Sequence, residues 1–381
     1  MTKNWPPCGR IAHLAGGLTA QVEPMSDQVI LWPQSIDGKE AQISIPTFGR
    51  LYYALEKYNL CIVGVEFITD QSEYLGEAPT QFRGYAKQQQ IWPNWDAFQL
   101  WRSLALSSFE AKDGLGYDLS NRISYQLNAL NDKLKNLSIK YRDQLNAIVL
   151  KNDFIDGQRF RDGFTNLVYQ EFHSFLFEAG ILRDYLCEYV YNFSSTAGLK
   201  LTHKNSEKIQ EITTANGLLK ALNNAPELSE LEEQLKVSMA PDGWLFELGI
   251  YRDLVMHTAP ISIASHQLYA IQIVHEFPDG KQFPSVRFPL PDNIESVYKD
   301  RCRRGDFRKY IEQFDALCEK SLDEYGKYDC LEYANKIHGL LSNLALSIGG
   351  LSPNEPKRMV FTKTHEGTNA GTKFIGTTDE L

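Results

Sequence analysis

The fold is decided by residues 164–193, which read FTNLVYQEFHSFLFEAGILRDYLCEYVYNF. Apolar side chains recur in this stretch at every third or fourth position over about eight helical turns. They are Phe164, Val168, Phe172, Phe175, Ala179, Leu182, Leu186, Tyr189 and Phe193. This spacing predicts one long amphipathic helix with an aromatic-rich buried face. Gly180 within it marks a kink or a point of close packing.

Other parts of the chain carry the same helical period. The pattern becomes helical from about Trp95, and residues 121–150 again place apolar side chains three or four positions apart. Further helices are expected over residues 244–258, 295–325 and 330–348. Pro260 ends the first of these, because a proline disfavours helical geometry in the residue before it. The fold class is therefore predicted to be mainly α.

Two regions carry strand signals instead. Near the N-terminus, residues 28–32, 41–45 and 61–68 predict strands, with a helix start at Pro46 between them. Farther on, residues 270–274 and 285–288 flank the turn-forming stretch Pro278-Asp279-Gly280-Lys281. We therefore expect a small α+β region at the start of the chain and a β-hairpin inserted among the helices.

The length and composition of the chain fit two folded parts and a tail. With 381 residues, of which 43% are hydrophobic, the chain can bury a sizeable core. We expect an α+β subdomain over residues 1–90 and a helical region over residues 91–354, whose bundle covers about residues 155–350. The Thr- and Gly-rich residues 355–381 are expected to form a flexible tail.

Several classes of protein are disfavoured by the composition. No run approaches the roughly 18 apolar residues of a membrane helix, and the N-terminus lacks an apolar secretion signal. A cytoplasmic protein with no membrane partner is therefore expected. The six cysteines contain no C-x-x-C pair and the eight histidines have no zinc-like spacing, so we expect no metal and no cofactor.

The charge of the chain limits how it meets nucleic acid. A net charge of −9 disfavours indiscriminate coating, because that mode depends on neutralising many phosphates. One basic run, at residues 299–309, interrupts this acidic balance. Its candidates for nucleic-acid binding are Arg301, Arg303, Arg304 and Arg308. The alternative is the solvated start of a helix, which is the commoner role of such a run.

The best candidate for chemistry is the stretch Arg252-Asp253-Leu254-Val255-Met256-His257, in which four residues separate an arginine from a histidine. A second pair, Arg358 and His365, lies in the expected tail, where nothing would hold its geometry. The first pair ends a predicted helix that follows two long amphipathic helices. In this setting it resembles the HEPN superfamily of helical bundles, many of which are metal-independent ribonucleases of toxin–antitoxin and anti-phage systems.

The resemblance covers about residues 155–350 and implies roles for the motif. Arg252 matches the family arginine, His257 the family histidine and Asp253 the polar residue after the arginine. The family implies RNA as substrate, a homodimer with both motifs in one cleft, and an antitoxin or another regulatory protein as a partner. It also leaves a second function open, that of a non-catalytic module that binds a nucleotide, RNA or a protein.

The residue types suit RNA cleavage without a metal. Histidine titrates near neutral pH and can move protons, while arginine holds a permanent charge in a fork that matches phosphate oxygens. Positions five apart on an ideal α-helix differ by about 140°, so Arg252 and His257 point apart on a regular helix. They converge only where the helix distorts or ends, and a two-fold dimer would bring two motif helices together.

A structural interpretation stands beside the catalytic one. In a helical bundle Arg252 would then pair with a carboxylate of a neighbouring helix, for which Asp184 and Glu178 are candidates. His257 would cap the end of its own helix. A third hypothesis makes the chain a helical scaffold in which Arg252 forms only that internal ion pair. His338, on the last expected helix, either faces the motif or is an ordinary exposed or half-buried side chain.

Overall fold

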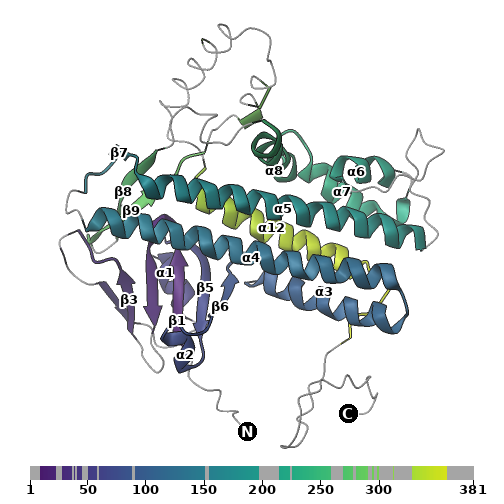
Figure 1. The fold of residues 1–381 in the computed structure, drawn as a ribbon, viewed down its shortest axis with the longest axis horizontal. Coiled ribbons are helices and arrows are strands. Elements are labelled where there is room, and N and C mark those ends of the chain that lie inside the picture. Colours follow the sequence, from purple (N-terminus) through teal and green to yellow (C-terminus); the bar gives the residue numbers. More distant parts are fainter. Residues whose placement is uncertain are drawn as a thin grey trace, which may run out of the picture.

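Two long helices lie side by side along the length of the molecule and form its middle layer (Figure 1). They are α4, Gly114–Val149, and α5, Gly163–Thr196. This computed structural model describes residues 9–22, 28–36, 38, 41–44, 50–57, 60–87, 91–150, 154–196, 214–223, 225–258, 269–277, 280–290, 294–295, 298–299, 312 and 328–357. Within these residues the fold is mainly α, as the sequence predicts, with two small antiparallel sheets.

The larger sheet has six strands in the order β4–β3–β2–β1–β5–β6 and lies on one side of α4 (Figure 1). Its strands are β1 Gly9–Leu14, β2 Thr19–Val22, β3 Gln28–Trp32, β4 Ala41–Ser44, β5 Ile62–Ile68 and β6 Gln81–Gly84. Three short helices lie between strands, namely η1 Ala15–Gly17, α1 Leu51–Lys57 and α2 Gln71–Tyr74. The predicted strands β3, β4 and β5 and the predicted α+β character are confirmed.

The sequence did not predict three strands of this sheet. Strands β1, β2 and β6 are four to six residues long, and polar residues break their alternation. His13 and Thr19 are polar yet buried, so the inward face of β1 and β2 does not read as apolar. The amide of Asn131 on α4 bonds the backbone of β6, accepting from Gly84 N at 3.1 Å and donating to Phe82 O at 2.9 Å.

Four helices form the bundle beside this sheet. Helix α4 packs against α3, Pro93–Glu110, and α5, while α12, Cys330–Gly350, contacts all three. Tyr141 of α4 and Trp101 of α3 are fully buried, and Trp101 Nε1 donates to Ala345 O of α12 at 3.1 Å. The buried side chains of the sheet and of the bundle form one continuous core.

Helix α5 confirms the helix predicted from residues 164–193. Phe172, Phe175 and Leu182 of its apolar stripe are fully buried. Phe164 is the exception, because it lies in the first turn with its side chain 39% exposed. Gly180 is a point of close packing. A Cβ there would lie 2.7 Å from Cδ of Arg252 on a neighbouring helix.

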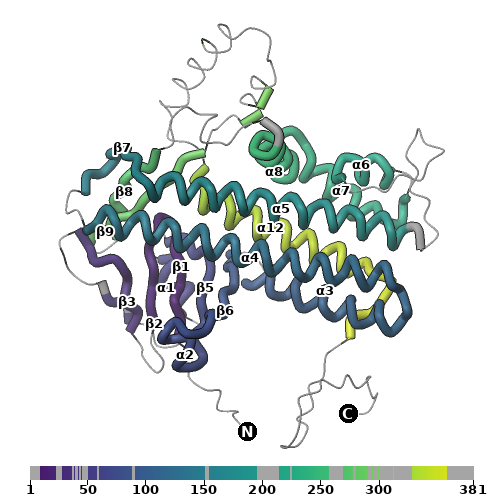
Figure 2. Tube along the Cα trace, in the orientation of Figure 1, coloured from purple at the N-terminus to yellow at the C-terminus, as the bar shows by residue number. Residues whose placement is uncertain are grey.

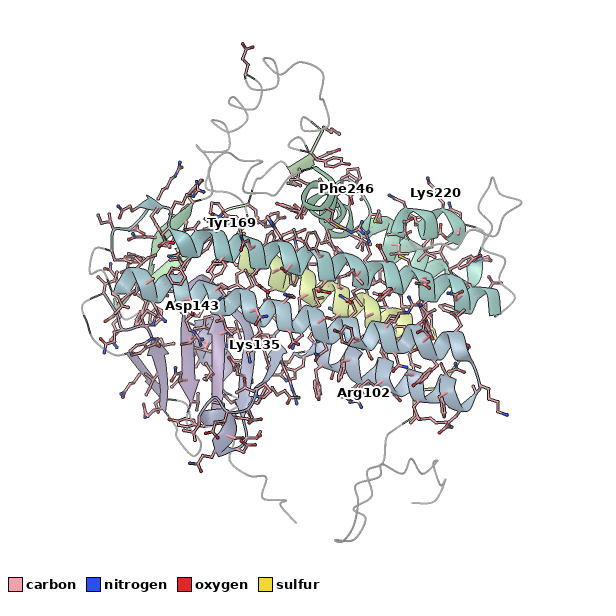
Figure 3. All side chains as sticks on the ribbon, viewed as in Figure 1. Arg102, Lys135, Asp143, Tyr169, Lys220 and Phe246 are labelled. Atoms are coloured by element: carbon pink, nitrogen blue, oxygen red, sulfur yellow. The ribbon has the colours of Figure 1, made fainter. Side chains whose placement is uncertain are left out.

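The smaller sheet contains the predicted hairpin. Strands β8, Ala270–Glu276, and β9, Gln282–Arg287, pair antiparallel, and β7, Arg159–Phe160, adds a short third strand that the sequence did not indicate. The hydroxyl of Tyr169 on α5 donates to Pro289 O at 3.0 Å, just beyond β9 (Figure 3). The hairpin therefore closes one end of the bundle.

Further short helices cover the side of α5 that faces away from α4 (Figure 2). They are α6 Ala215–Leu222, η3 Pro226–Leu228, α7 Ser229–Ser238, α8 Trp244–Asp253 and the π-helix η4 Leu254–Thr258. Most of the helix predicted over residues 295–325 lies outside the described residues. The end of α12 continues into residues 351–357, which return to α3 through the bond from Asn354 Nδ2 to Ser108 Oγ at 3.0 Å. No helix in the described part of the chain combines the length and the apolar character needed to cross a membrane.

A buried histidine of α12, His338, packs against the sheet and predicts that acid lowers the stability of the protein. His338 is 1% exposed, and a Cβ at Gly84 would lie 2.3 Å from its Cε1. Burial lowers the pKa of His338 to about 3, from 6.5. Between these two pH values His338 is protonated in the unfolded chain and neutral in the folded chain. Stability is therefore complete above pH 6.5 and falls as the pH drops toward 3.

We expect the free energy of unfolding to fall by up to about 1.4 kcal/mol per pH unit for this one proton. Urea titrations at several pH values, from slightly alkaline to moderately acidic, measure the slope. His338→Gln should reduce the slope relative to the unmodified chain, and the difference isolates this group from every other titration. Equal slopes in the two proteins would rule out the role of His338.

Candidate functional site

The arginine–histidine motif spans a change of helix type. Arg252 and Asp253 end α8, and His257 belongs to the π-helix η4, Leu254–Thr258. A π-helix is bonded between residues five apart rather than four, so the chain turns less per residue than in an α-helix. The backbone therefore departs from a regular α-helix between Arg252 and His257. The side chain of His257 lies outside the described part of the structure.

The side chain of Arg252 packs against α5 at Gly180, which has no side chain to block it. A Cβ at Gly180 would lie 2.7 Å from both Cδ and Nε of Arg252, closer than such contacts allow. The Arg252 side chain is 20% exposed, and its Nε is buried with no hydrogen-bond partner among the described residues. Gly180 thus lets the arginine stem run along the surface of the neighbouring helix.

Two carboxylates contact the Arg252 guanidinium at long distances. Nη2 lies 3.3 Å from Asp184 Oδ2, and Nη1 lies 3.4 Å from Asp253 Oδ1. Charge-assisted bonds between arginine and carboxylate are typically about 2.7–2.9 Å long. Both contacts are therefore longer than ordinary charge-assisted bonds.

A second arginine shares Asp184. Arg183 donates from Nε to Asp184 Oδ1 at 2.9 Å, and its Nη2 lies 2.8 Å from the same oxygen. Arg183 is 9% exposed, and a Cβ at Gly249 of α8 would lie 3.6 Å from its Nη1. The sequence reasoning missed Arg183. The only signal was a charged pair next to the buried stripe of α5.

The other residues that the sequence offered lie elsewhere. Glu178 is not the partner of Arg252, because it bonds Gln126 of α4 through its side chain and its carbonyl oxygen. His338 does not face the motif and is not half-buried, since it is enclosed between α12 and Gly84 of β6. The basic residues Arg301, Arg303, Arg304 and Arg308 lie outside the described residues.

A buried polar cluster between the sheet and α4 has the order of groups found in serine hydrolases. Ser138 Oγ lies 3.0 Å from His13 Nδ1, and His13 Nε2 lies 2.7 Å from Glu66 Oε1. Ser138 and His13 are 3% and 1% exposed, and neither lines one of the main cavities among the described residues. Among the described residues both side chains are buried, and their bond joins β1 to α4.

Lys135 of α4 completes this cluster on the side of the sheet (Figure 3). Its Nζ lies 3.1 Å from Glu66 Oε2, and Thr80 donates to the same carboxylate. Burial acts to raise the pKa of Glu66, but the bonds from His13 and Thr80 and the charge of Lys135 outweigh it and bring the pKa to about 2. The carboxylate is therefore ionised and fully engaged.

A cavity of about 270 Å³ lies between η1, the residues just before β5, the hairpin and the start of α12. Asp329 lines it, and burial raises the pKa of this carboxyl to about 6. Its oxygens already accept from Tyr141 Oη, Phe288 N, Leu331 N and Glu332 N. Asp329 therefore caps α12 and joins three elements, and none of the residues that line the cavity comes from α5 or α8.

Comparisons of this chain with family models, with curated proteins and with solved structures give no match.

The close contact at Gly180 predicts an unusual effect of an alanine. Replacing glycine by alanine inside a helix normally stabilises it by up to about 1 kcal/mol. Gly180→Ala should instead destabilise the protein by about 1 kcal/mol or more, because its methyl group collides with Arg252. Chemical denaturation measures the change in the free energy of unfolding.

Gly249→Ala is the matched control, since its Cβ would make only an ordinary contact with Arg183. It should be neutral or stabilising. Combining Gly180→Ala with Arg252→Ala should remove most of the penalty. If Gly180→Ala proves as mild as Gly249→Ala, the proposed packing of Arg252 on α5 is wrong.

Proposed function

We propose that this chain is a HEPN-like, metal-independent endoribonuclease whose site contains Arg252, His257 and Asp253. The observation that supports the proposal best is the π-helix η4 between the arginine and the histidine. Residues five apart diverge on an α-helix, and the wider π-turn reduces that divergence. Single π-turns inside helices occur frequently at functional sites.

The environment of Arg252 also suits a phosphate. The Arg252 side chain is 20% exposed, and its guanidinium is held by contacts of 3.3 and 3.4 Å. Phosphate oxygens offer an arginine shorter, two-pronged bonds. A cation that is positioned in advance, but loosely bonded, can stabilise negative charge as it develops on a reacting phosphate.

The reaction that these groups support is attack by the ribose 2′-hydroxyl on the adjacent phosphorus. The bond from O2′ to phosphorus forms, the bond from phosphorus to O5′ breaks, the 2′-hydroxyl loses a proton and the 5′-oxygen gains one. Arg252 would hold the phosphate oxygens, and His257 would transfer a proton. The wider role we propose is toxin–antitoxin or anti-phage defence, with an antitoxin or another regulatory protein as partner.

A second candidate function is a non-catalytic HEPN-like module that binds a nucleotide, RNA or a protein partner. The ion pair between Arg252 and Asp184 favours it, because an arginine engaged by a carboxylate is also typical of a structural contact. In that case Arg252→Ala would weaken binding or stability, and no variant would change a rate of cleavage.

Cleavage of RNA in the presence of a chelator tests the enzymatic function. A purified protein should cut a single-stranded RNA in EDTA and leave the matching 2′-deoxy strand intact. Arg252→Ala and His257→Ala should each lower the rate by about 100-fold or more, because each removes a group that acts on the reacting phosphate. Gel analysis of the products measures the rates.

The second arginine–histidine pair of the chain supplies the control. Arg358→Ala and His365→Ala should cleave like the unmodified protein. Thermal unfolding should show that all four variants are folded. Undiminished cleavage by a protein carrying both Arg252→Ala and His257→Ala would exclude this site, and the absence of any cleavage would favour the binding module.

We also propose a homodimer, because a single histidine cannot act as acid and base at the same instant and a two-fold interface presents the motif twice. Sedimentation equilibrium should give twice the chain mass of 43.5 kDa. A monomer at micromolar concentration that still cleaves RNA would contradict a site shared between two copies.

A further inference from the structure

Asp184 is shared between two arginines that come from different helices. Its Oδ1 contacts Arg183 at 2.8 and 2.9 Å, and its Oδ2 contacts Arg252 at 3.3 Å. Arg183 and Asp184 lie on α5, whereas Arg252 lies on α8. The three groups form a row of alternating charge, and Asp253 contacts Arg252 at the end of this row at 3.4 Å.

The two arginines hold Asp184 with unequal strength. Arg183 makes two contacts of ordinary charge-assisted length, and its side chain is 11% exposed. Arg252 makes one longer contact and is 20% exposed. Arg183 therefore compensates most of the Asp184 charge. Without Arg183, the negative charge of Asp184 would interact more strongly with Arg252.

This inequality has a consequence for the phosphate that the proposed function requires. An arginine tightly paired with a carboxylate offers a phosphate little net charge, because the phosphate must first displace an anion that is already in place. When a second cation neutralises that carboxylate, the arginine presents more of its positive charge to a phosphate.

We propose that Arg183 is a positioning residue of this site, and that by neutralising Asp184 it keeps the charge of Arg252 available to an RNA phosphate. The proposal rests on the proposed function. Arg183 itself does not touch the RNA. Asp184 fixes the place of both guanidinium groups, and Arg183 sets the charge that Asp184 presents to Arg252.

Binding of a single-stranded RNA with 2′-O-methyl groups tests the proposal, since this probe lacks the nucleophile and is not cut. We expect Arg183→Gln to weaken binding about tenfold at low salt and to reduce the dependence of affinity on salt by about one phosphate contact. Arg252→Gln should do the same. Fluorescence anisotropy at several salt concentrations measures both quantities.

The decisive variant carries Arg183→Gln and Asp184→Asn together. It removes one positive and one negative charge and leaves Arg252 with the single carboxylate contact to Asp253, while the amide that replaces the Asp184 carboxylate can still accept a bond from Arg252. We expect this double variant to bind the RNA like the unmodified protein. Arg183→Lys should also bind normally because it keeps the charge. If Arg183→Gln folds poorly, Arg183→Lys still tests the proposal, because weakened binding by this variant would contradict a role based on charge alone.

The outcomes separate the two proposals. If Arg252→Gln changes neither binding nor cleavage, the proposed function fails. If Arg252→Gln weakens binding and Arg183→Gln does not, only the role of Arg183 is overturned. If Arg183→Gln weakens binding and the double variant does not restore it, Arg183 acts by direct contact or by packing, and charge compensation is wrong.

Arg122→Gln is the matched control for loss of an ion pair on α5. Arg122 of α4 lies 3.2 Å from Glu188 Oε1 and is engaged with two carboxylates, as Arg252 is. Its removal should leave RNA binding and its salt dependence unchanged. An equal loss on removing Arg122 would show that any arginine on this surface contributes, and would overturn a specific role for Arg183.

Discussion

Burial of one helix on several sides is the constraint on which the structure depends. The sheet, α3, α5 and α12 all pack against α4, so several of its polar side chains are buried, and most of these bond to neighbouring elements. Each such bond attaches a different element to α4. They join Asn131 to β6, Ser138 to His13 of β1, Gln126 to Glu178 of α5, and Gln144 to Asp162 before α5.

The candidate site follows from the placement of α5. Once α5 is held against α4, the side of α5 that carries Gly180 and Asp184 is free to receive α8. A glycine of each helix lies beside the arginine of the other, but only Gly180 is needed to make room. Gly180 accommodates Arg252, and Gly249 lies beside Arg183. Four charged groups, Arg183, Asp184, Arg252 and Asp253, are thereby gathered beside a tightly packed core.

The sequence predicts the long helices well and the sheet poorly. Helices α4 and α5 repeat their apolar positions over many turns, and a signal of that length survives a single exception such as Phe164. Strands β1, β2 and β6 are short and carry inward polar residues whose partners lie on other elements. His13 is stable in the core only because Glu66 and Ser138 meet it there, and neither is near it in the chain.

The sequence by itself determined the long helices, the hairpin and the presence of an arginine and a histidine at the end of one helix, because these features depend on periodicity and on residues close together in the chain. Only the tertiary structure decided the partners of that arginine. Asp184 and Arg252 are 68 positions apart, and Asp184 was one of two carboxylates that the sequence allowed. The placement of Arg183 beside Gly249 of α8 and the burial of His338 against Gly84 were likewise decided by packing between elements. The π-helix that contains His257 was also not indicated by the sequence. Contacts of this kind depend on how distant segments meet, which no local pattern records.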